Sequence, residues 1–583
     1  MRRLEHFPNL VTMFFTRAAA LGDAPFLWRR EEAGWESLSW HETARRVAAL
    51  AAALGRLGLE AGDRVLLVSE NRPEWCIADL AIMAAGCVTV PAYTSNLPRD
   101  HGHVLEDSGA RAAIVSTAKL ATALIPAVLG SGKCKLVIGM DAMRIGQPGA
   151  FRFETFASLI EGEADVAARA AACARFGRDD LACLIYTSGT GGAPRGVMQH
   201  HGAILHNVAG EAEIISEDFG WGEEVFLSFL PLSHAYEHSA GQHLPIGLGG
   251  QIYYSRGLEK LAADIEEVRP TIMVVVPRLF EVLRARIGKA IEKQGALPHW
   301  LLRRALALGD EPTPAQKPLD LLLSATIRRK VGKRFGGRLK ALVSGGAPLN
   351  PEVGRFFSSL GIILLQGYGQ TETGPVISCN RPKAGIRLDT VGPPLADTEV
   401  RIADDGEILV RGELVMKGYW RNPEETARAL DRDGWLATGD IGHLDEAGRL
   451  VITDRKKDII VNDKGDTIAP QRIEGMLTLQ PEILQAMVVG DRRPYLVALV
   501  VPDPEWLAGR DAAAPDVARA VQAAVDRVNA GLAGAERVRR IAIADAPFAI
   551  ENAQLTPSLK IRRHVIGEAY AARLDGLYRT TTY

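Results

Sequence analysis

The sequence lacks the usual marks of a secreted, membrane-spanning or nucleic-acid-binding protein. Its six cysteines include no Cys-x-x-Cys pair, which argues against a disulfide framework or a thiolate metal site and predicts buried thiols in a reducing compartment. No apolar run approaches the roughly 18 uncharged residues that cross a bilayer. A net charge of −2 over 583 residues gives no electrostatic reason to expect a nucleic-acid partner.

An export signal is also lacking. Arg2 and Arg3 give the positive start of a signal peptide, but Glu5 and Pro8 interrupt the apolar stretch that should follow, and no small-residue cleavage site comes after it. We therefore expect a cytoplasmic protein. Peripheral attachment at the inner membrane surface would need no spanning helix and stays open, as does the oligomeric state.

Apolar runs alternate with helical patterns through the first half of the chain. Helices are expected over 41–57 and 74–85, and strands in two series. The first series covers 65–68, 87–91, 112–115 and 136–138, and the second covers 225–230, 251–254, 272–276, 341–344 and 362–365. Strands separated by helices predict an α/β fold whose parallel sheets are covered by helices on both faces.

The second half of the chain changes character twice. Short strands and glycine turns from about residue 389 predict a β-rich subdomain over 389–454. Mixed α+β patterns resume at residue 455. The sequence thus predicts a large N-terminal domain, 1–454, and a small α+β C-terminal domain, 455–583. A basic helical segment over 280–335 is either a solvated face or a patch for CoA phosphates or anionic lipid.

A loop with the chemistry of a phosphate site spans residues 186–197, which read Tyr-Thr-Ser-Gly-Thr-Gly-Gly-Ala-Pro-Arg-Gly-Val after an apolar strand over 181–185. Hydroxyls, bare backbone N–H groups and Arg195 can surround a polyphosphate. The loop is not a Walker A motif, and Pro194 stands where a dinucleotide fingerprint needs its third glycine. The alternative is a flexible Gly/Ser/Thr loop.

This segment resembles the phosphate loop of the AMP-forming acyl-CoA synthetases, members of the adenylate-forming superfamily. The usual pattern is Tyr-Thr-Ser-Gly-Thr-Thr-Gly-x-Pro-Lys-Gly-Val, so Gly191 replaces a threonine and Arg195 replaces the lysine while keeping its charge. The resemblance implies ATP binding by Thr187, Ser188, Gly189, Thr190, Gly191, Gly192 and Arg195.

A second motif, Gln366 to Gly374, resembles the family's Tyr-Gly-x-Thr-Glu segment. In the resemblance Glu372 and Thr187 are Mg²⁺ ligands, Tyr368 offers a flat face to adenine, and Thr371 bonds the α-phosphate. The alternative is a glycine-rich turn with a solvated glutamate. With the adenine-binding segment upstream, the implied nucleotide positions are Gly345, Gly346, Ala347, Gln366, Gly367, Tyr368, Gly369 and Thr371.

Further motifs lie towards the C-terminus. Asp440 would accept hydrogen bonds from the ribose hydroxyls with help from Arg455, and Lys457 matches the hinge about which a mobile C-terminal domain rotates between half-reactions. Lys560, in Leu-Thr-Pro-Ser-Leu-Lys, matches the catalytic lysine that bridges the substrate carboxylate and the α-phosphate. The alternative for Lys560 is an exposed lysine near a basic tail.

The segment Leu-Pro-Leu-Ser-His-Ala-Tyr-Glu-His, 230–238, resembles the border of the family's acyl pocket. His234 would position the carboxylate or gate the pocket. Long-chain enzymes show His-x-x-Glu-Arg here, so His238 replaces an arginine and its partner is left open. This segment, the basic insert and the text Gly-Gly-Ala-Pro-Leu-Asn-Pro-Glu resemble long-chain fatty acid–CoA ligases.

The resemblance implies an enzyme that uses ATP, Mg²⁺, CoA and a fatty acid. It would form acyl-AMP and pyrophosphate, then acyl-CoA and AMP. Within the superfamily the alternatives are a fatty acyl-AMP ligase that loads a carrier protein, an aryl or medium-chain acyl-CoA ligase, a peptide-synthetase unit and a luciferase relative. A catalytically degenerate lipid-binding or uptake protein is the alternative from a different class.

Overall fold

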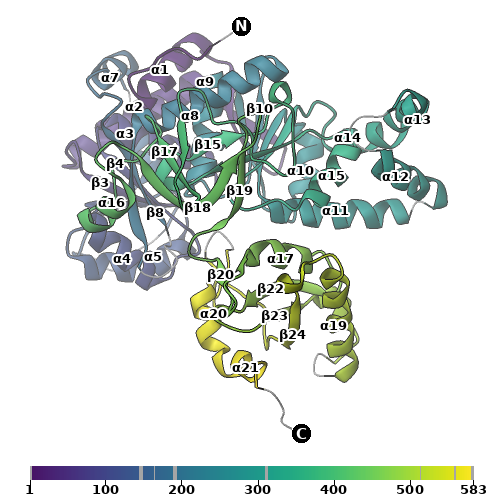
Figure 1. Cartoon of the computed structure of the whole chain (residues 1–583). Helices are drawn as coiled ribbons and strands as arrows, with labels where there is room; N and C mark the ends of the chain where they lie inside the picture. Colours follow the sequence, from purple (N-terminus) through teal and green to yellow (C-terminus); the bar gives the residue numbers. More distant parts are fainter. Residues whose placement is uncertain are drawn as a thin grey trace.

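Two large sheets, a small antiparallel sheet and a separate C-terminal domain make up the computed structural model (Figure 1). It describes residues 3–143, 149–162, 164–187, 193–293, 295–308, 313–511, 514–556 and 560–579. Five positions of the predicted phosphate loop lie outside the described residues: Ser188, Gly189, Thr190, Gly191 and Gly192.

The first sheet has seven strands in the order β7-β6-β5-β3-β4-β8-β9. All neighbours pair in parallel except β8 and β9, and β3 and β5 are almost wholly buried, as in sheets covered on both faces. The bounds are β3 Arg64–Val68, β4 Val88–Ala92, β5 Ala112–Val115, β6 Leu136–Gly139, β7 Arg152–Thr155, β8 Leu181–Thr187 and β9 Arg195–His200.

The second sheet has eight strands in the order β15-β14-β13-β12-β10-β11-β1-β2, with a parallel centre. Its edge is the antiparallel pair β1–β2 from the N-terminus, which the sequence patterns did not indicate. The bounds are β1 Pro25–Arg30, β2 Trp35–Ser39, β10 Val225–Ser228, β11 Gln251–Tyr254, β12 Ile272–Val275, β13 Ala341–Ser344, β14 Leu364–Gly369 and β15 Val376–Cys379.

The prediction for β14 was wrong in its bounds. A strand was expected over 362–365 with a glycine-rich segment after it, but β14 continues through Gly367 and Gly369. A Cβ on Gly369 would lie 1.8 Å from the carbonyl oxygen of Pro375. Glycine therefore permits β14 and β15 to approach each other, and the motif residues are part of the sheet.

Helices of the N-terminal half lie between the two sheets. The largest hydrophobic cluster joins residues of α1, α2 and α3 to strands of both sheets, and every residue of α3 is buried. The six cysteines are free and buried, as predicted. The helices are α1 Leu10–Leu21, α2 Trp40–Arg56, α3 Pro73–Ala84, α4 Pro98–Ser108, α5 Ala118–Ser131, α6 Phe156–Ile160, α7 Val166–Cys173, α8 His201–Ile214, α9 Leu244–Leu248, α10 Leu261–Val268 and α15 Pro351–Ser359, with π-helices η1 Ile215–Phe219 and η2 Glu237–His243.

The basic segment between β12 and β13 is helical, as predicted, and forms the protrusion at the right of Figure 1. It is broken into α11 Pro277–Glu292, α12 Ala296–Leu308, η3 Pro314–Gln316, α13 Lys317–Leu323, η4 Ser324–Arg328 and α14 Arg329–Arg334. Leu302, Ala305 and Leu323 pack into the neighbouring core, whereas Leu297 and Leu321 are exposed. In the part of the chain that the structure describes, every helix is too short or too polar to cross a membrane.

The β-rich segment is a four-stranded antiparallel sheet, β16-β17-β18-β19; strands were predicted at 399–402, 407–410 and 450–452, and β18 was not predicted. Its strands are β16 Glu399–Ile402, β17 Glu407–Arg411, β18 Leu436–Leu444 and β19 Leu450–Arg455, with α16 Pro423–Ala429 and the short helices η5 Thr371–Thr373 and η6 Pro382–Ala384 nearby in the chain. Asp440 and Arg455 are opposite each other on β18 and β19.

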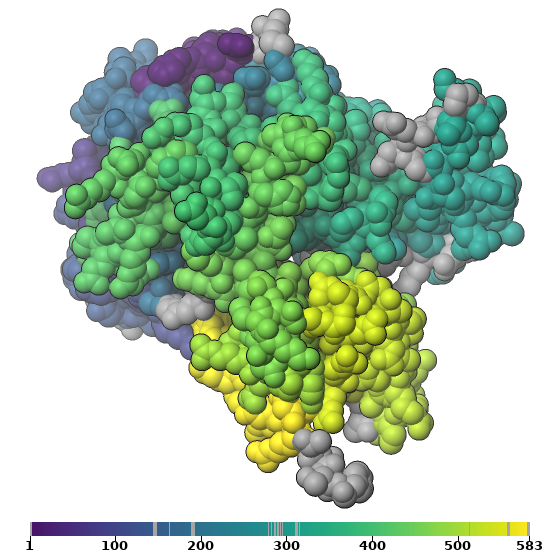
Figure 2. Space-filling model, viewed as in Figure 1, coloured from purple at the N-terminus to yellow at the C-terminus, as the bar shows by residue number. Residues whose placement is uncertain are grey.

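The C-terminal domain is the lower lobe in Figures 1 and 2, coloured yellow-green to yellow. A three-stranded sheet, β22-β23-β24, packs against α17 and α19 around its own core. Its elements are β20 Ile460–Val461, β21 Thr467–Ile468, α17 Pro470–Leu477, β22 Ile483–Val489, β23 Leu496–Pro502, α18 Pro504–Leu507, α19 Pro515–Asn529, η7 Gly534–Glu536, β24 Val538–Ile543, α20 Arg563–Ala569 and α21 Ala571–Gly576. The domain boundary at 454/455 stays a prediction.

Candidate active site

A cavity of about 1770 Å³ lies where the two domains meet. Every predicted site residue that the structure describes lines it, including residues that are hundreds of positions apart in the chain. They are Thr187, Arg195, His234, Gly345, Gly346, Ala347, Gln366, Gly367, Tyr368, Gly369, Thr371, Glu372, Asp440, Arg455, Lys457 and Lys560.

The parallel sheet explains part of this convergence. β13 and β14 are neighbours that run in the same direction, so the segments after them emerge at one edge of the sheet. Gly345 to Ala347 directly follow β13, and Thr371 and Glu372 follow β14. A Cβ on Gly345 would lie 2.8 Å from the ring of Tyr236, so this turn packs closely against the segment that carries His234.

Asp440 is buried at the centre of the polar part of the cavity. Its Oδ2 atom accepts hydrogen bonds from the Tyr368 hydroxyl at 2.6 Å and the Gln370 amide at 2.7 Å. Its Oδ1 atom accepts one from Arg455 Nε at 3.1 Å. Gln370 stands in the variable position of the motif, which explains why the sequence analysis left it out. These bonds join β14 to the β18–β19 pair.

Glu372 is held by a tyrosine that the sequence analysis missed. The Tyr419 hydroxyl donates to Glu372 Oε1 at 2.8 Å, and the Arg195 guanidinium lies over the Tyr419 ring at 4.4 Å. Arg195 also pairs with Glu425 at 2.5 Å. Burial, with the nearby Glu372 charge, raises the pKa of Tyr419, so its hydroxyl stays a donor. No motif contains both partners of either contact.

Lys560 comes from the C-terminal domain and faces groups of the N-terminal domain. Its backbone exchanges hydrogen bonds with Thr556, N–H to Oγ1 at 3.1 Å and C=O from N–H at 2.8 Å. Its side chain is open to the water of the cavity although protein surrounds it. This burial and the charge of Arg455 lower the pKa of Lys560 to about 8, against the opposing effect of Asp440 and Glu372.

His234 is a neutral hydrogen-bond donor towards the cavity. Burial lowers its pKa to about 4, and the charge of Lys560 acts in the same direction. Its Nδ1 atom accepts the backbone N–H of Tyr236 at 3.2 Å, so in the neutral ring the proton is on Nε2.

One part of the cavity wall is mainly apolar. It belongs to α8, η1, η2 and the neighbouring strands of the second sheet, and its side chains are Ile214, Ile215, Phe219, Ala240, Leu244, Ile272, Val274, Ala341, Val343, Leu365, Val376 and Cys379. A cavity with a polar part and a mainly apolar part suits a ligand or ligand pair of mixed character.

Comparisons with known proteins agree with this geometry. Residues 14–420 match the AMP-binding enzyme family, and residues 457–582 match the AMP-binding enzyme C-terminal domain. The chain belongs to the AMP-binding enzyme family. The family membership and the enzymatic nature implied by the motifs are thereby confirmed. The predicted α/β fold class is confirmed by the similarity to solved structures.

Relatives of this AMP-binding enzyme extend over nearly its whole length. A long-chain-fatty-acid–CoA ligase of Mycobacterium tuberculosis is 33% identical over 98% of this chain and 97% of its own. A long-chain-fatty-acid–CoA ligase of Mus musculus is 30% identical over 98% and 87%. The adenylation domain of a carboxylic acid reductase from Segniliparus rugosus, solved with AMP and a co-purified carboxylic acid, has a TM-score of 0.77 and 24% identity over 98% and 94% of the two chains.

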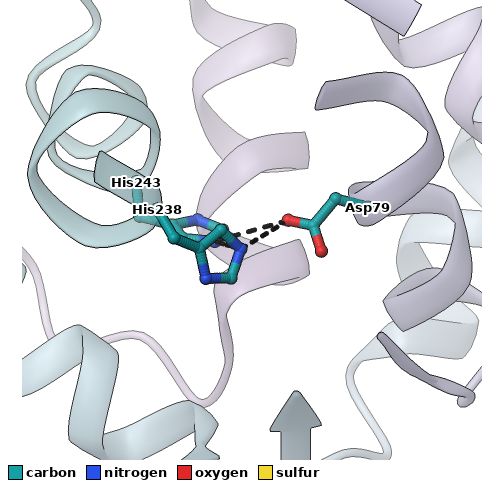
Figure 3. Close-up of side chains that lie close together, drawn as sticks. All are labelled: Asp79, His238 and His243. Atoms are coloured by element: carbon teal, nitrogen blue, oxygen red, sulfur yellow. Dashed lines mark hydrogen bonds and ion pairs between the residues drawn. The ribbon is translucent and has the colours of Figure 1, made fainter. Parts of the chain in front are cut away.

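His238 does not line the cavity of this AMP-binding enzyme, and its partner is Asp79 of α3 (Figure 3). His238 Nε2 lies 2.9 Å from Asp79 Oδ2, which also accepts the Gln242 amide at 2.7 Å. His243 Nε2 is 3.3 Å from His238 Nε2. His238 and His243 are five residues apart on the π-helix η2, a spacing that brings them to one side of the helix.

Asp79, His238 and His243 are fully buried and are also a group of donors that a metal ion could use. Burial alone would raise the pKa of Asp79, but the two facing imidazoles lower it, so the carboxylate is ionised. Burial lowers the pKa of His243 to about 3, which keeps that ring neutral. The hydrogen bonds to Asp79 already join α3 to η2, so we assign the cluster a structural role.

Asp79→Ala should lower the free energy of unfolding by about 3–5 kcal/mol, because it leaves buried donors of His238 and Gln242 without their acceptor. Thermal melting measures the loss, with Asp23→Ala as the control, since the Asp23 side chain is 94% exposed. A chelator should leave the melting temperature of the wild type unchanged. A chelator-sensitive melting temperature would contradict the structural role.

Proposed function

We propose that this AMP-binding enzyme activates a long-chain fatty acid and transfers it to CoA. A carboxylate oxygen attacks the α-phosphorus of ATP and releases pyrophosphate; the CoA thiol then attacks the acyl carbon and releases AMP. The observation that carries the proposal is one cavity in which Asp440, Glu372 and Lys560 line a polar part and a mainly apolar part lies beside it. Full-length relatives named long-chain ligases support the acid class.

The polar wall suits ATP. The loop from Thr187 to Arg195 would hold the phosphates, the Tyr368 ring and Gly346 the adenine, and Asp440 with Arg455 the ribose hydroxyls. A Cβ on Gly346 would meet no atom within 4 Å, and its φ of +82° suits glycine, so backbone can face a flat base here.

Glu372 fits the role of a magnesium ligand. Its Oε1 atom accepts from Tyr419, which orients the carboxylate at the cavity wall, and Thr187 adds a hydroxyl oxygen on the same wall. Magnesium bound with ATP would neutralise charge on the departing pyrophosphate.

Two hydrogen-bond donors, the Lys560 ammonium and the His234 ring, would assist the first step. The carboxylate and the α-phosphate are both anions, and the Lys560 ammonium between them would reduce their repulsion. The neutral His234 ring would donate its Nε2–H to the carboxylate and fix its approach. No general base is needed, because the acid reacts as its carboxylate.

The second step needs room for CoA. We place the domain boundary at 454/455 and the hinge at Lys457. In the chain Lys457 lies between Arg455, the last residue of β19, and β20, and it lines the cavity. Rotation there would withdraw Lys560 once acyl-AMP has formed and open a path for the thiol.

Purified enzyme should convert ATP and a long-chain acid to AMP when CoA is present, with acyl-CoA as the product. The assay compares straight-chain acids of medium and long length with benzoate, with CoA or a carrier protein as acceptor. A higher kcat/KM for long chains with CoA is expected, because the apolar wall gains contact with each added methylene. Formation of ADP, or transfer to carrier protein alone, would contradict the proposal.

Lys560→Ala should reduce acyl-AMP formation by about 100-fold or more, because the ammonium acts as the anions meet. Thioester formation from supplied acyl-AMP should change little. The two half-reactions are measured separately, by ATP–pyrophosphate exchange and by acyl-CoA release. Equal loss in both would exclude a role confined to the first step.

The rate of acyl-AMP formation should fall as the pH rises through about 8, the pKa of Lys560, because the ammonium loses its proton above that value. Above the pKa, loss of one proton from a single group lowers this rate about tenfold per pH unit. In Lys560→Arg the residual rate should show no such decline, since guanidinium stays charged. Persistence of the decline in this variant would assign it to another group.

A further inference from the structure

Glu211 is a carboxyl group in the apolar wall of the cavity. It lies on α8 one turn beyond Asn207, whose amide bonds the Val376 backbone at 2.5 Å and 3.1 Å and so fixes α8 to the start of β15. Residues four apart share one face of a helix, so Glu211 also faces this sheet. It lies near Cys379 of β15 and Tyr236, and all three residues line the cavity.

The Glu211 carboxyl forms no hydrogen bond with the described residues around it. Neither carboxyl oxygen has a partner there; Oε2 is enclosed by protein, whereas Oε1 is not and is the oxygen that a ligand in the cavity can reach. The lining side chains that follow it along the helix, Ile214, Ile215 and Phe219, are apolar. The Asp79 carboxylate in the core also has one unpartnered oxygen, Oδ1, but its Oδ2 atom accepts two hydrogen bonds, whereas Glu211 accepts none from the described residues.

A buried carboxyl without a hydrogen-bond partner destabilises the protein. A ligand that supplies the partner therefore binds with a more favourable free energy. Burial raises the pKa of Glu211 to about 8, so the group is protonated at neutral pH. A protonated carboxyl offers one O–H donor and one carbonyl acceptor. A hydroxyl or carbonyl oxygen matches this pair, whereas an unsubstituted methylene chain leaves it unpaired.

We infer that Glu211 is a specificity-determining residue that selects acids with a hydroxyl or carbonyl oxygen along the acyl chain and hydrogen-bonds that oxygen within the apolar wall. The inference rests on the proposed function, because it requires the acyl chain to lie against this wall. It also narrows the substrate class from long-chain acids in general to oxygenated ones.

The test compares kcat/KM for an unsubstituted long-chain acid with a series of the same length that carries one hydroxyl at successive positions. At one or more positions the wild type should prefer the hydroxy acid by about tenfold or more, because a site built for a polar group rejects the analogue that lacks it. Glu211→Leu should abolish the preference and raise kcat/KM for the unsubstituted acid. Glu211→Gln, which keeps a donor and an acceptor, should retain part of it.

Glu213→Leu is the matched control. Glu213 is on the same helix two residues further and does not line the cavity, so the preference should be unchanged. The melting temperature of Glu211→Leu should rise, since the unpaired carboxyl is gone, and this readout needs no substrate.

The outcomes separate the two claims. Turnover of the unsubstituted acid without preference for any hydroxy isomer would overturn the Glu211 inference and leave the proposed function standing. An equal change for both acid types in Glu211→Leu would also overturn it. Failure of every acid to yield AMP would overturn the proposed function itself.

Discussion

The site depends on one carboxylate that three donors share. Asp440 accepts from Tyr368, Gln370 and Arg455, which belong to two different sheets, and it is buried where these sheets meet. A buried anion is stable only when paired, so these segments are held in one arrangement. The ends of β14 and β19 and the middle of β18 therefore form a single wall, against which the C-terminal domain presents Lys560.

The pKa of Lys560 depends on charged groups of the N-terminal domain as well as on its own burial. The charge of Lys560 is opposed by burial and by Arg455 at the domain boundary, and it is favoured by Asp440 and Glu372 of the N-terminal domain. The pKa of about 8 lies well below that of an ordinary lysine, and negative charge brought into the cavity by substrates would stabilise the ammonium. The same charge helps to keep His234 neutral. In the proposed mechanism the first half-reaction would depend on the domains being together and the second on their separation.

Burying a carboxylate costs free energy, and Asp79 and Glu211 differ in how this cost is met. Asp79 is ionised because His238, His243 and Gln242 surround it. It does not line the cavity, and its hydrogen bonds hold α3 against η2. Glu211 has no such partners and is protonated instead. The difference lies in position, since Asp79 is enclosed by helices α3 and η2 while Glu211 is open to a space that a ligand can enter.

Much of this protein could be predicted from the sequence, because local patterns carry the relevant physics. Apolar runs predicted most strands of the two sheets, and ordered motifs predicted the family and the residues that line the cavity. The sequence could not indicate that β1 completes the second sheet, that Tyr419 holds Glu372, or that His238 pairs with Asp79, since each pairing joins segments separated by 47 to more than 150 residues. Nor could it show Glu211 unpaired, because burial and the lack of a partner belong to the packed structure alone.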